Sequence, residues 1–249
     1  MRVAPDTILS FARTFKNQIN KFRHAARHSV SFAQCGEDLI IDYCARTLGL
    51  REFSYLDIGA HHPSYLSNTY YFYRRGRRGV CVEPDVSLLP PFRRRRPGDV
   101  LLNIGVGPEE GAREFFVMTT PTLNTFSRQE AARYESYGNQ RVERVEQVQI
   151  RCIDSILDEH FTGAPQLVSL DVEGLDFDIL RSFDFARVRP PIICVETLTY
   201  AEDGTERKLT EIVEFMRTRD YFDYADTYVN TIFVDRAAWS RRPGARVGA

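Results

Sequence analysis

The chain has 249 residues, of which 43% are hydrophobic and 12% aromatic, which is enough to build the core of one large α/β domain. Its 33 basic and 34 acidic side chains give a formal net charge of −1, so there is no global electrostatic attraction to nucleic acid, and we expect no such partner.

Residues 1–30 carry bulky apolar residues at helical spacing with arginines and lysines between them, and we expect a basic amphipathic helix there. It could dock on a membrane surface or a partner, or it could simply cap the domain. The segment lacks the apolar core and cleavage site of a signal peptide, and no apolar run approaches the roughly 18 residues of a transmembrane segment. We therefore expect a cytoplasmic protein. The 5 cysteines are odd in number and without a CxxC pair, and we expect them to be reduced core thiols.

From residue 53 onward, apolar runs alternate with helical patterns, which is typical of a parallel sheet built from βαβ units. In chain order the pattern predicts a strand in FSYLDIGA (53–60), a helix in SNTYYFYRR (67–75), a strand in GVCVEP (79–84), a short helix in VSLLPPFRR (86–94) and a strand in DVLLNIGVG (99–107). Residues 113–118 then alternate like an added strand, for which 145–153 could be the partner.

The polar stretch 119–144 between these two segments is long and aromatic, and we expect it to be a lid over the substrate that the domain binds. Beyond it the pattern predicts a strand in QLVSLDVEG (166–174), a helix in LDFDILRSF (175–183), a strand in PIICVET (191–197), a helix in 205–219 and an antiparallel hairpin in 221–235. The whole predicts one domain over 31–238 and a disordered tail over 239–249. Its fold class is a Rossmann-like, seven-stranded, mostly parallel sheet of the class I methyltransferase type, with helices on both faces.

In an open parallel sheet, ligands bind beyond the carboxyl ends of the strands, so the residues that end each apolar run are the candidates for a site. The first strand ends in Asp57, Gly59, Ala60 and His61, where the glycine would let the backbone approach a ligand closely. Glu83 ends the second strand, at the spacing from the glycine turn where a carboxylate usually holds a ribose diol. Each acid could instead cap a helix or lie on the surface, and His61 could be an ordinary loop histidine.

The later strands end in residues of the same kind. Pro84 follows Glu83, and Asn103 and Gly105 could border an adenine. Asp171 and Glu173 end the fourth predicted strand, where they are candidates for a catalytic base or for a helix cap. Together with Glu196 they could hold magnesium, but strand-end carboxylates serve at least as often as bases, and we assign no metal.

The ordered motifs resemble those of FkbM-like methyltransferases. The similarity is carried by SFAQCGEDLI, LDIGAHHPSYLSNTYYFYRRGRRGVCVEP, LNIGVG, IDSIL, SLDVEGLDFDILRSFDF and PIICVET, and it covers roughly residues 31 to 235. The resemblance implies S-adenosylmethionine as the cofactor and places Asp57, Gly59, Ala60 and Glu83 on it, with Asp171 and Glu173 at the floor of the active site. It also implies O-methylation of a sugar, glycan or natural-product hydroxyl.

Methyl transfer to a hydroxyl needs alignment of the acceptor and removal of one proton. We expect Asp171 to be the base, His61 to be the second candidate, and Glu173 to orient them. The loop GAHHP lacks the second glycine of the usual family loop, which keeps open a catalytically weak binding module within a larger assembly. A nicotinamide-dependent oxidoreductase is disfavoured because the chain has no GxGxxG motif.

Overall fold

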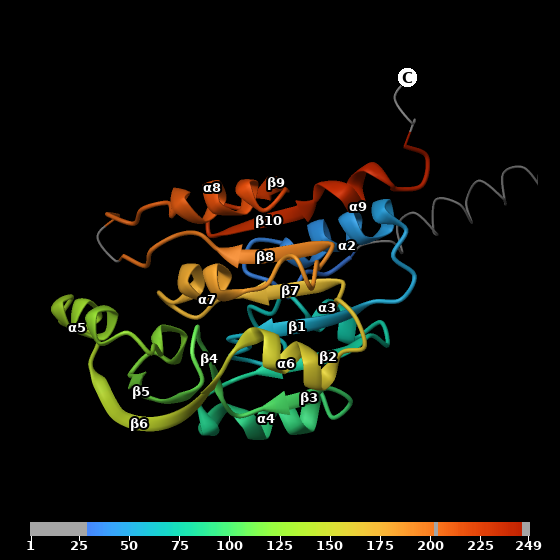
Figure 1. The fold of residues 1–249 in the computed structure, drawn as a ribbon. Coiled ribbons are helices and arrows are strands. Elements are labelled where there is room, and N and C mark those ends of the chain that lie inside the picture. The colour runs from blue at the N-terminus through green and yellow to red at the C-terminus, as the bar shows by residue number, and fades with distance from the viewer. Residues whose placement is uncertain (1–28, 202–203, 246–249) are drawn as a thin grey trace, which may run out of the picture. The chain divides into compact units, whose positions relative to one another are not determined.

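The computed structural model describes residues 29–201 and 204–245. Within that part of the chain, seven strands form a sheet in the order β3-β2-β1-β7-β8-β10-β9 (Figure 1). They are β1 (Ser54–Ile58), β2 (Arg78–Val82), β3 (Val100–Leu102), β7 (Leu167–Leu170), β8 (Ile192–Glu196), β9 (Tyr221–Asp226) and β10 (Asn230–Asp235). Neighbours from β3 to β8 are parallel, and β10 runs antiparallel to β8 and β9. The predicted sheet, with its terminal hairpin, is confirmed.

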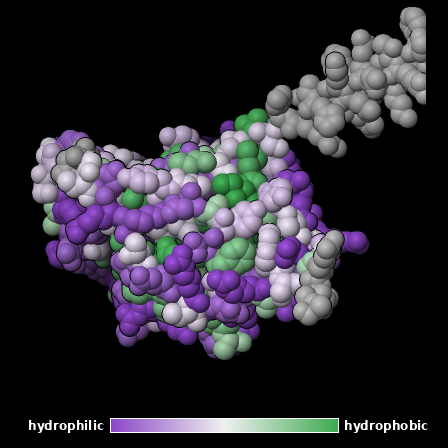
Figure 2. All heavy atoms as spheres, turned by 90° about the horizontal axis from the view of Figure 1, so that it is seen from above, coloured by the Kyte–Doolittle hydropathy of each residue, from purple (hydrophilic) through white to green (hydrophobic). Residues whose placement is uncertain are grey.

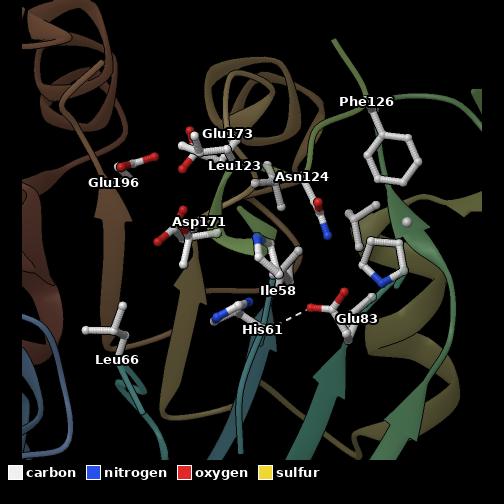
Figure 3. Close-up of a pocket in the computed structure, with 18 of the residues that line it drawn as sticks. Ile58, His61, Leu66, Glu83, Leu123, Asn124, Phe126, Asp171, Glu173 and Glu196 are labelled. Carbon is white, nitrogen blue, oxygen red and sulfur yellow. Dashed lines mark hydrogen bonds between the residues drawn. The ribbon is translucent and has the colours of Figure 1, made fainter. Parts of the chain in front are cut away.

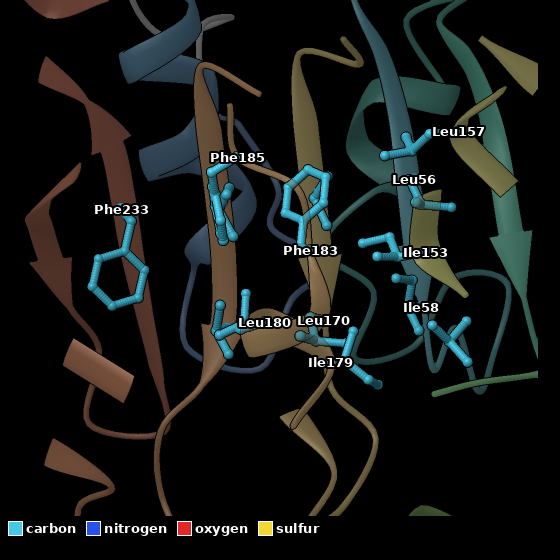
Figure 4. Packing of buried hydrophobic residues seen from close by; sticks show 14 of the residues in the cluster. Leu56, Ile58, Ile153, Leu157, Leu170, Ile179, Leu180, Phe183, Phe185 and Phe233 are labelled. Carbon is cyan, nitrogen blue, oxygen red and sulfur yellow. The ribbon is translucent and has the colours of Figure 1, made fainter. Parts of the chain in front are cut away.

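Helices cover both faces of this sheet, because the side chains of each strand alternate between two apolar layers. Leu56 and Ile58 pack in one layer with α6 (Ile153–His160), α7 (Asp176–Ser182) and α8 (Thr210–Thr218) (Figure 4). Tyr55 packs in the other layer, which contains residues of α2 (Glu37–Leu48), α3 (Tyr70–Tyr73) and α4 (Leu89–Arg95). The alternation decides which residues of β1 reach which face.

The predicted third strand is wrong in its second half. The chain leaves the main sheet after β3, and Gly105–Val106 forms β4, which pairs with β6 (Val142–Arg151) in a second sheet. The side-chain amide of Asn103 donates hydrogen bonds of 2.9 Å to the carbonyl of Glu83 and 2.7 Å to that of Pro84. These bonds fix the bend that a continuous strand would not contain.

The second sheet has the order β4-β6-β5, and β5 (Gly111–Met118) runs antiparallel to β6. This confirms the expected pairing of residues 113–118 with the segment near 145–153. The stretch 119–144 between them contains a 3₁₀ helix, η2 (Pro121–Leu123), and α5 (Arg128–Ser136). The pattern did not predict α5 because only Ala131 and Tyr134 of its residues are buried, so its apolar periodicity is weak.

Two smaller expectations need correction. Cys44, Cys81 and Cys194 are buried, but Cys35 is exposed and Cys152 is half-buried, so not all the thiols belong to the core. The tail expected to be disordered from residue 239 begins inside α9 (Arg236–Ser240), whose Trp239 packs on Phe222 and Tyr224. The helix expected over residues 1–30 lies almost wholly outside the described residues.

The surface over α8, β9, β10 and α9 is a mosaic of hydrophilic residues with small hydrophobic areas between them (Figure 2). Among the helices that the structure describes, none has both the length and the apolar character required to cross a bilayer.

A buried arginine neutralises two carboxylates beneath the sheet. Arg96 donates a 2.7 Å hydrogen bond to Asp99 and lies 3.8 Å from a carboxylate oxygen of Asp57. It also donates to the hydroxyls of Tyr55 and Thr69, at 3.1 and 3.0 Å. The Tyr55 hydroxyl donates to Asp99, and that of Thr69 donates to Asp57. The network ties β1 to the segment between α4 and β3.

Replacing this arginine by an apolar residue tests the network. Arg96→Met leaves Asp57 and Asp99 buried without their cation, and we expect the free energy of unfolding in urea to fall by about 3–5 kcal/mol. Arg128→Met is the control, because the side chain of Arg128 is 73% exposed in its ion pair with Glu114 and should contribute less than about 1 kcal/mol. Equal losses in the two variants would contradict the assigned role.

Candidate active site

A pocket with a cavity volume of about 220 Å³ opens at the carboxyl ends of β1, β2, β7 and β8. Figure 3 shows Asp171, Glu173 and Glu196 on one side of it and Glu83 and Phe126 on the other. The second sheet and the segment between β5 and β6 supply another part of its wall. Of the predicted site residues, seven line the pocket: Gly59, His61, Glu83, Pro84, Gly105, Asp171 and Glu173.

The other three predicted residues, Asp57, Ala60 and Asn103, do not line the pocket. Asp57 points to the opposite face of the sheet, where Arg96 holds it. Ala60 is buried in the apolar layer beside α2 and α3. Asn103 lies outside the pocket, and its side-chain amide donates hydrogen bonds to the carbonyls of Glu83 and Pro84. These side chains support the walls of the pocket from outside it.

The turn after β1 brings two strands into close contact. Gly59 has a φ of 78°, and a Cβ placed there would lie 1.7 Å from the carbonyl oxygen of Asp171. Only glycine fits this position, because any side chain would collide with the backbone of the neighbouring strand end. His61 follows at a φ of 47°, a left-handed conformation that is uncommon for a residue with a side chain.

Glu83 is 4% exposed, and backbone N–H groups hold both of its carboxylate oxygens. Oε2 accepts from the N–H of His61 at 2.8 Å, and Oε1 accepts from the N–H of Asp85 at 2.7 Å. Burial raises the pKa of Glu83 to about 8, against the two backbone hydrogen bonds, which lower it. The carboxyl group therefore lies in a fixed orientation at the edge of the pocket.

Asp85 connects this corner to the segment between β5 and β6. It is 1% exposed and accepts hydrogen bonds of 3.0 Å from both Asn124 and Arg144. The sequence pattern did not indicate Asn124 and Arg144, because their hydrogen bonds to Asp85 form only when β6 and the segment after η2 fold over the end of β2.

Three partly buried carboxyl groups, those of Asp171, Glu173 and Glu196, form the opposite side of the pocket and are called the acid group below. Each offers one oxygen that lies within 4.8 Å of the oxygens of the other two. In the described part of the chain, no arginine or lysine forms an ion pair with any of them. Oxygen ligands at this spacing would also suit a divalent cation, and our expectation of no metal stays a prediction.

The members of the acid group differ in their affinity for protons. Burial raises the pKa of Asp171 to about 6, against a hydrogen bond with Glu196 that lowers it. Burial and then the charge of Asp171 raise the pKa of Glu196 well above its ordinary value. Burial, followed by the charge of Asp171, raises the pKa of Glu173 to about 8. At neutral pH, Asp171 is therefore the member that is mainly ionised.

Glu173 is held from the segment between β5 and β6. The hydroxyl of Tyr134, a buried residue of α5, donates a 2.8 Å hydrogen bond to Oε2 of Glu173 and lowers its pKa. The hydroxyl of Thr125 donates at 2.8 Å to the carbonyl of the same residue, whose φ is 50°. No sequence signal marks Tyr134, because it lies in a polar stretch and meets Glu173 only through the fold.

His61 offers a second group that could accept a proton. Burial, and to a lesser extent the charge of His62, lowers the pKa of His61, so its imidazole is neutral at pH 7. The pocket therefore combines a fixed carboxyl group at one end with a base and two proton-holding acids at the other.

Comparisons with known proteins give one family. A model described as the methyltransferase FkbM domain matches residues 57–222, which is more than half of the chain. A search of curated proteins finds no significant match.

Among solved structures, the chain is similar to a precorrin-6y C5,15-methyltransferase from Geobacter metallireducens, with 12% identity, a TM-score of 0.41, and coverage of 83% of this chain and 91% of that chain. It is also similar to a 1,6-didemethyltoxoflavin-N1-methyltransferase from Burkholderia thailandensis with bound S-adenosylhomocysteine, with 10% identity, a TM-score of 0.39, and coverage of 94% and 90%. A TehB-like S-adenosylmethionine-dependent methyltransferase from Corynebacterium glutamicum has 11% identity, a TM-score of 0.40, and coverage of 93% and 100%.

The raised pKa of Glu173 makes folding depend on pH. The folded protein keeps a proton up to about pH 8 that the unfolded chain releases near pH 4.3, so stability falls as pH rises across this window. We expect the thermal midpoint of Glu173→Gln to fall less than that of the wild type between pH 6 and pH 8.5. Glu143→Gln, an exposed residue of β6, should behave like the wild type. Parallel curves for all three proteins would rule out ionisation of Glu173 as the cause.

Proposed function

This chain belongs to the FkbM methyltransferase family, whose cofactor is S-adenosylmethionine, and from that premise we propose that it methylates a hydroxyl oxygen of a sugar, glycan or natural-product acceptor. The observation that carries the proposal is the acid group, which places an ionised carboxylate beside two protonated ones in a pocket at the strand ends. A hydroxyl has a high pKa, so its methylation requires a base close to the reacting oxygen.

The residues at the strand ends fit the cofactor. Gly59 presents bare backbone to the pocket, and Glu83 lies opposite the acid group with its carboxyl plane fixed by the N–H groups of His61 and Asp85. Each oxygen of Glu83 uses one lone pair on the backbone and keeps another, which suits the two hydroxyls of a ribose. Donation from those hydroxyls would favour the charged form of Glu83 and lower its pKa. When bound, S-adenosylmethionine supplies the electrophilic methyl group.

Asp171 is the proposed base. Its pKa of about 6 leaves it ionised at neutral pH, yet high enough to accept a proton readily. Glu196 holds its own proton and is hydrogen-bonded to Asp171, which keeps the Asp171 carboxylate in one orientation. Glu173, held by Tyr134, is the proposed orienting residue on the acceptor side, and His61 is the second candidate for the base.

A catalytically weak binding module is the second candidate function. It is favoured by the strained conformation of His61, whose φ of 47° is one that glycine adopts more easily. Such a module would lack turnover, whether or not it keeps the cofactor, so cofactor binding and turnover have to be measured separately.

Cofactor binding tests Glu83. We expect isothermal titration to detect S-adenosylmethionine and S-adenosylhomocysteine but not NAD, and Glu83→Ala to weaken S-adenosylhomocysteine binding by about 1.5–3 kcal/mol through loss of a charge-assisted hydrogen bond. Glu109→Ala is the control, because Glu109 is an exposed residue between β4 and β5 that does not line the pocket. Unchanged affinity in Glu83→Ala would remove Glu83 from the cofactor site, and binding of NAD alone would overturn the proposed class.

Turnover tests Asp171. With an acceptor found by screening hydroxylated sugars, Asp171→Asn should reduce kcat by about 100-fold or more while S-adenosylhomocysteine affinity stays within a few-fold of the wild type. The wild-type rate should fall as pH drops below about 6, because Asp171 must lose its proton to act as a base, and Asp171→Asn should lack this limb. Normal turnover in the variant would exclude Asp171 and leave His61 as the candidate.

A further inference from the structure

Seven arginines gather at the edge of the molecule formed by β2, β3 and α4. They are exposed or half-buried, and they lie just after α3, at the first residue of β2 and in the last turn of α4. They are called the arginine face: Arg74, Arg75, Arg77, Arg78, Arg93, Arg94 and Arg95. None of the seven forms an ion pair with a carboxylate of the described residues. Ten other arginines of that part of the chain do form ion pairs, from Arg46 to Arg236.

The two segments that carry these arginines lie against each other. The N–H of Gly98, just beyond α4, donates a 3.3 Å hydrogen bond to the hydroxyl of Tyr73 at the end of α3. The side chain of Arg78 covers Gly98 and stacks 4.4 Å from the centre of the Tyr73 ring. Figure 1 shows α4 and β3 together at the side of the sheet away from β9. The positive charges therefore share one surface.

The arginine face carries uncompensated positive charge. Between residues 71 and 98 the chain contains two carboxylates, Glu83 and Asp85, and both lie at the carboxyl end of β2, where the pocket is. The arginines lie at the amino ends of β2 and β3. Like charges placed so closely repel one another, so an anionic partner would stabilise this surface.

The guanidinium groups are also presented in an orderly way. Arg75 lies 3.4 Å above the ring of Tyr71, and Arg74 lies 5.5 Å from the ring centre of Phe32. Stacking on an aromatic ring occupies the face of a guanidinium and turns its N–H edges outward, where they can bind phosphate oxygens. One N–H of Arg75 also donates a 3.4 Å hydrogen bond to the carbonyl of Tyr71. The geometry suits an array of phosphates rather than a single buried anion.

We propose that the arginine face docks this methyltransferase on an anionic lipid membrane. Clusters of four to eight basic residues are what binding to acidic lipids requires, and each contributes weakly, so stable attachment needs a second signal. Residues 1–30 have the composition of such a second signal, because apolar residues such as Phe11 and Phe15 alternate there with Arg13 and Lys16. The inference does not depend on the acceptor or on catalysis.

Cosedimentation of the full chain with vesicles tests the proposal. We expect binding to vesicles of phosphatidylcholine with phosphatidylglycerol, little binding to phosphatidylcholine alone, and loss of binding at high salt. The triple variant Arg77→Gln, Arg93→Gln and Arg94→Gln should bind the acidic vesicles at least about 10-fold more weakly. None of these three side chains forms a hydrogen bond, an ion pair or a ring contact within the described residues, so the thermal midpoint should stay close to the wild-type value.

A matched variant loses the same charge elsewhere. Arg113→Gln, Arg141→Gln and Arg181→Gln remove three arginines from β5, the position just before β6, and α7. This variant should bind vesicles like the wild type. The proposal is overturned if the two triple variants bind equally well. It is also overturned if only neutralising Arg13, Lys16, Lys21 and Arg23 weakens binding, or if an oligonucleotide binds the arginine face more tightly than the acidic vesicles do.

Discussion

Crowding of carboxyl groups at the ends of parallel strands is the constraint on which the rest of this structure depends. Asp57 is the last residue but one of β1, Asp171 directly follows β7, and β8 ends in Glu196. The contact between Gly59 and Asp171 packs the ends of β1 and β7 against each other. Buried negative charges so close together must be neutralised, protonated or separated. In this chain a cation neutralises the acids on one face of the sheet, whereas the acids at the pocket retain protons to different extents.

On the face of the sheet that Asp57 points to, the negative charges are neutralised by a cation. Asp57 points away from the pocket because side chains alternate along β1, and Arg96 meets it there together with Asp99. On the pocket side no cation of the described residues pairs with the acid group, so its members retain protons to different extents. A fully neutralised group could not exchange a proton near neutral pH, whereas this graded group can. The acid group without a cation destabilises the fold at the pocket, and the ion pairs of Arg96 stabilise it on the other face of the sheet.

The sequence predicted the sheet well because its strands obey simple rules. Runs such as those of β2, β7 and β8 are mainly apolar, as buried parallel strands require. Glu83 directly follows β2, and Asp171 and Glu173 follow β7. The side of the sheet that Asp57 faces was not predictable from the run alone, because both faces are apolar. The bend after β3 depends on long-range hydrogen bonds of Asn103, and α5 buries too few residues to show a period.

The segment between β5 and β6 connects the shape of the pocket to the proton affinity of the acid group. It is anchored at both ends of the pocket, through Tyr134 and Thr125 on Glu173, and through Asn124 on Asp85, beside Glu83. A shift of α5 that lengthened the hydrogen bond from Tyr134 would remove an interaction that lowers the pKa of Glu173, and would leave that group protonated over a wider range of pH. The same segment lines the pocket with η2 and Phe126. A ligand that displaced this segment would therefore alter the acid group, so the shape of the pocket and the proton affinity of its carboxyl groups cannot vary independently.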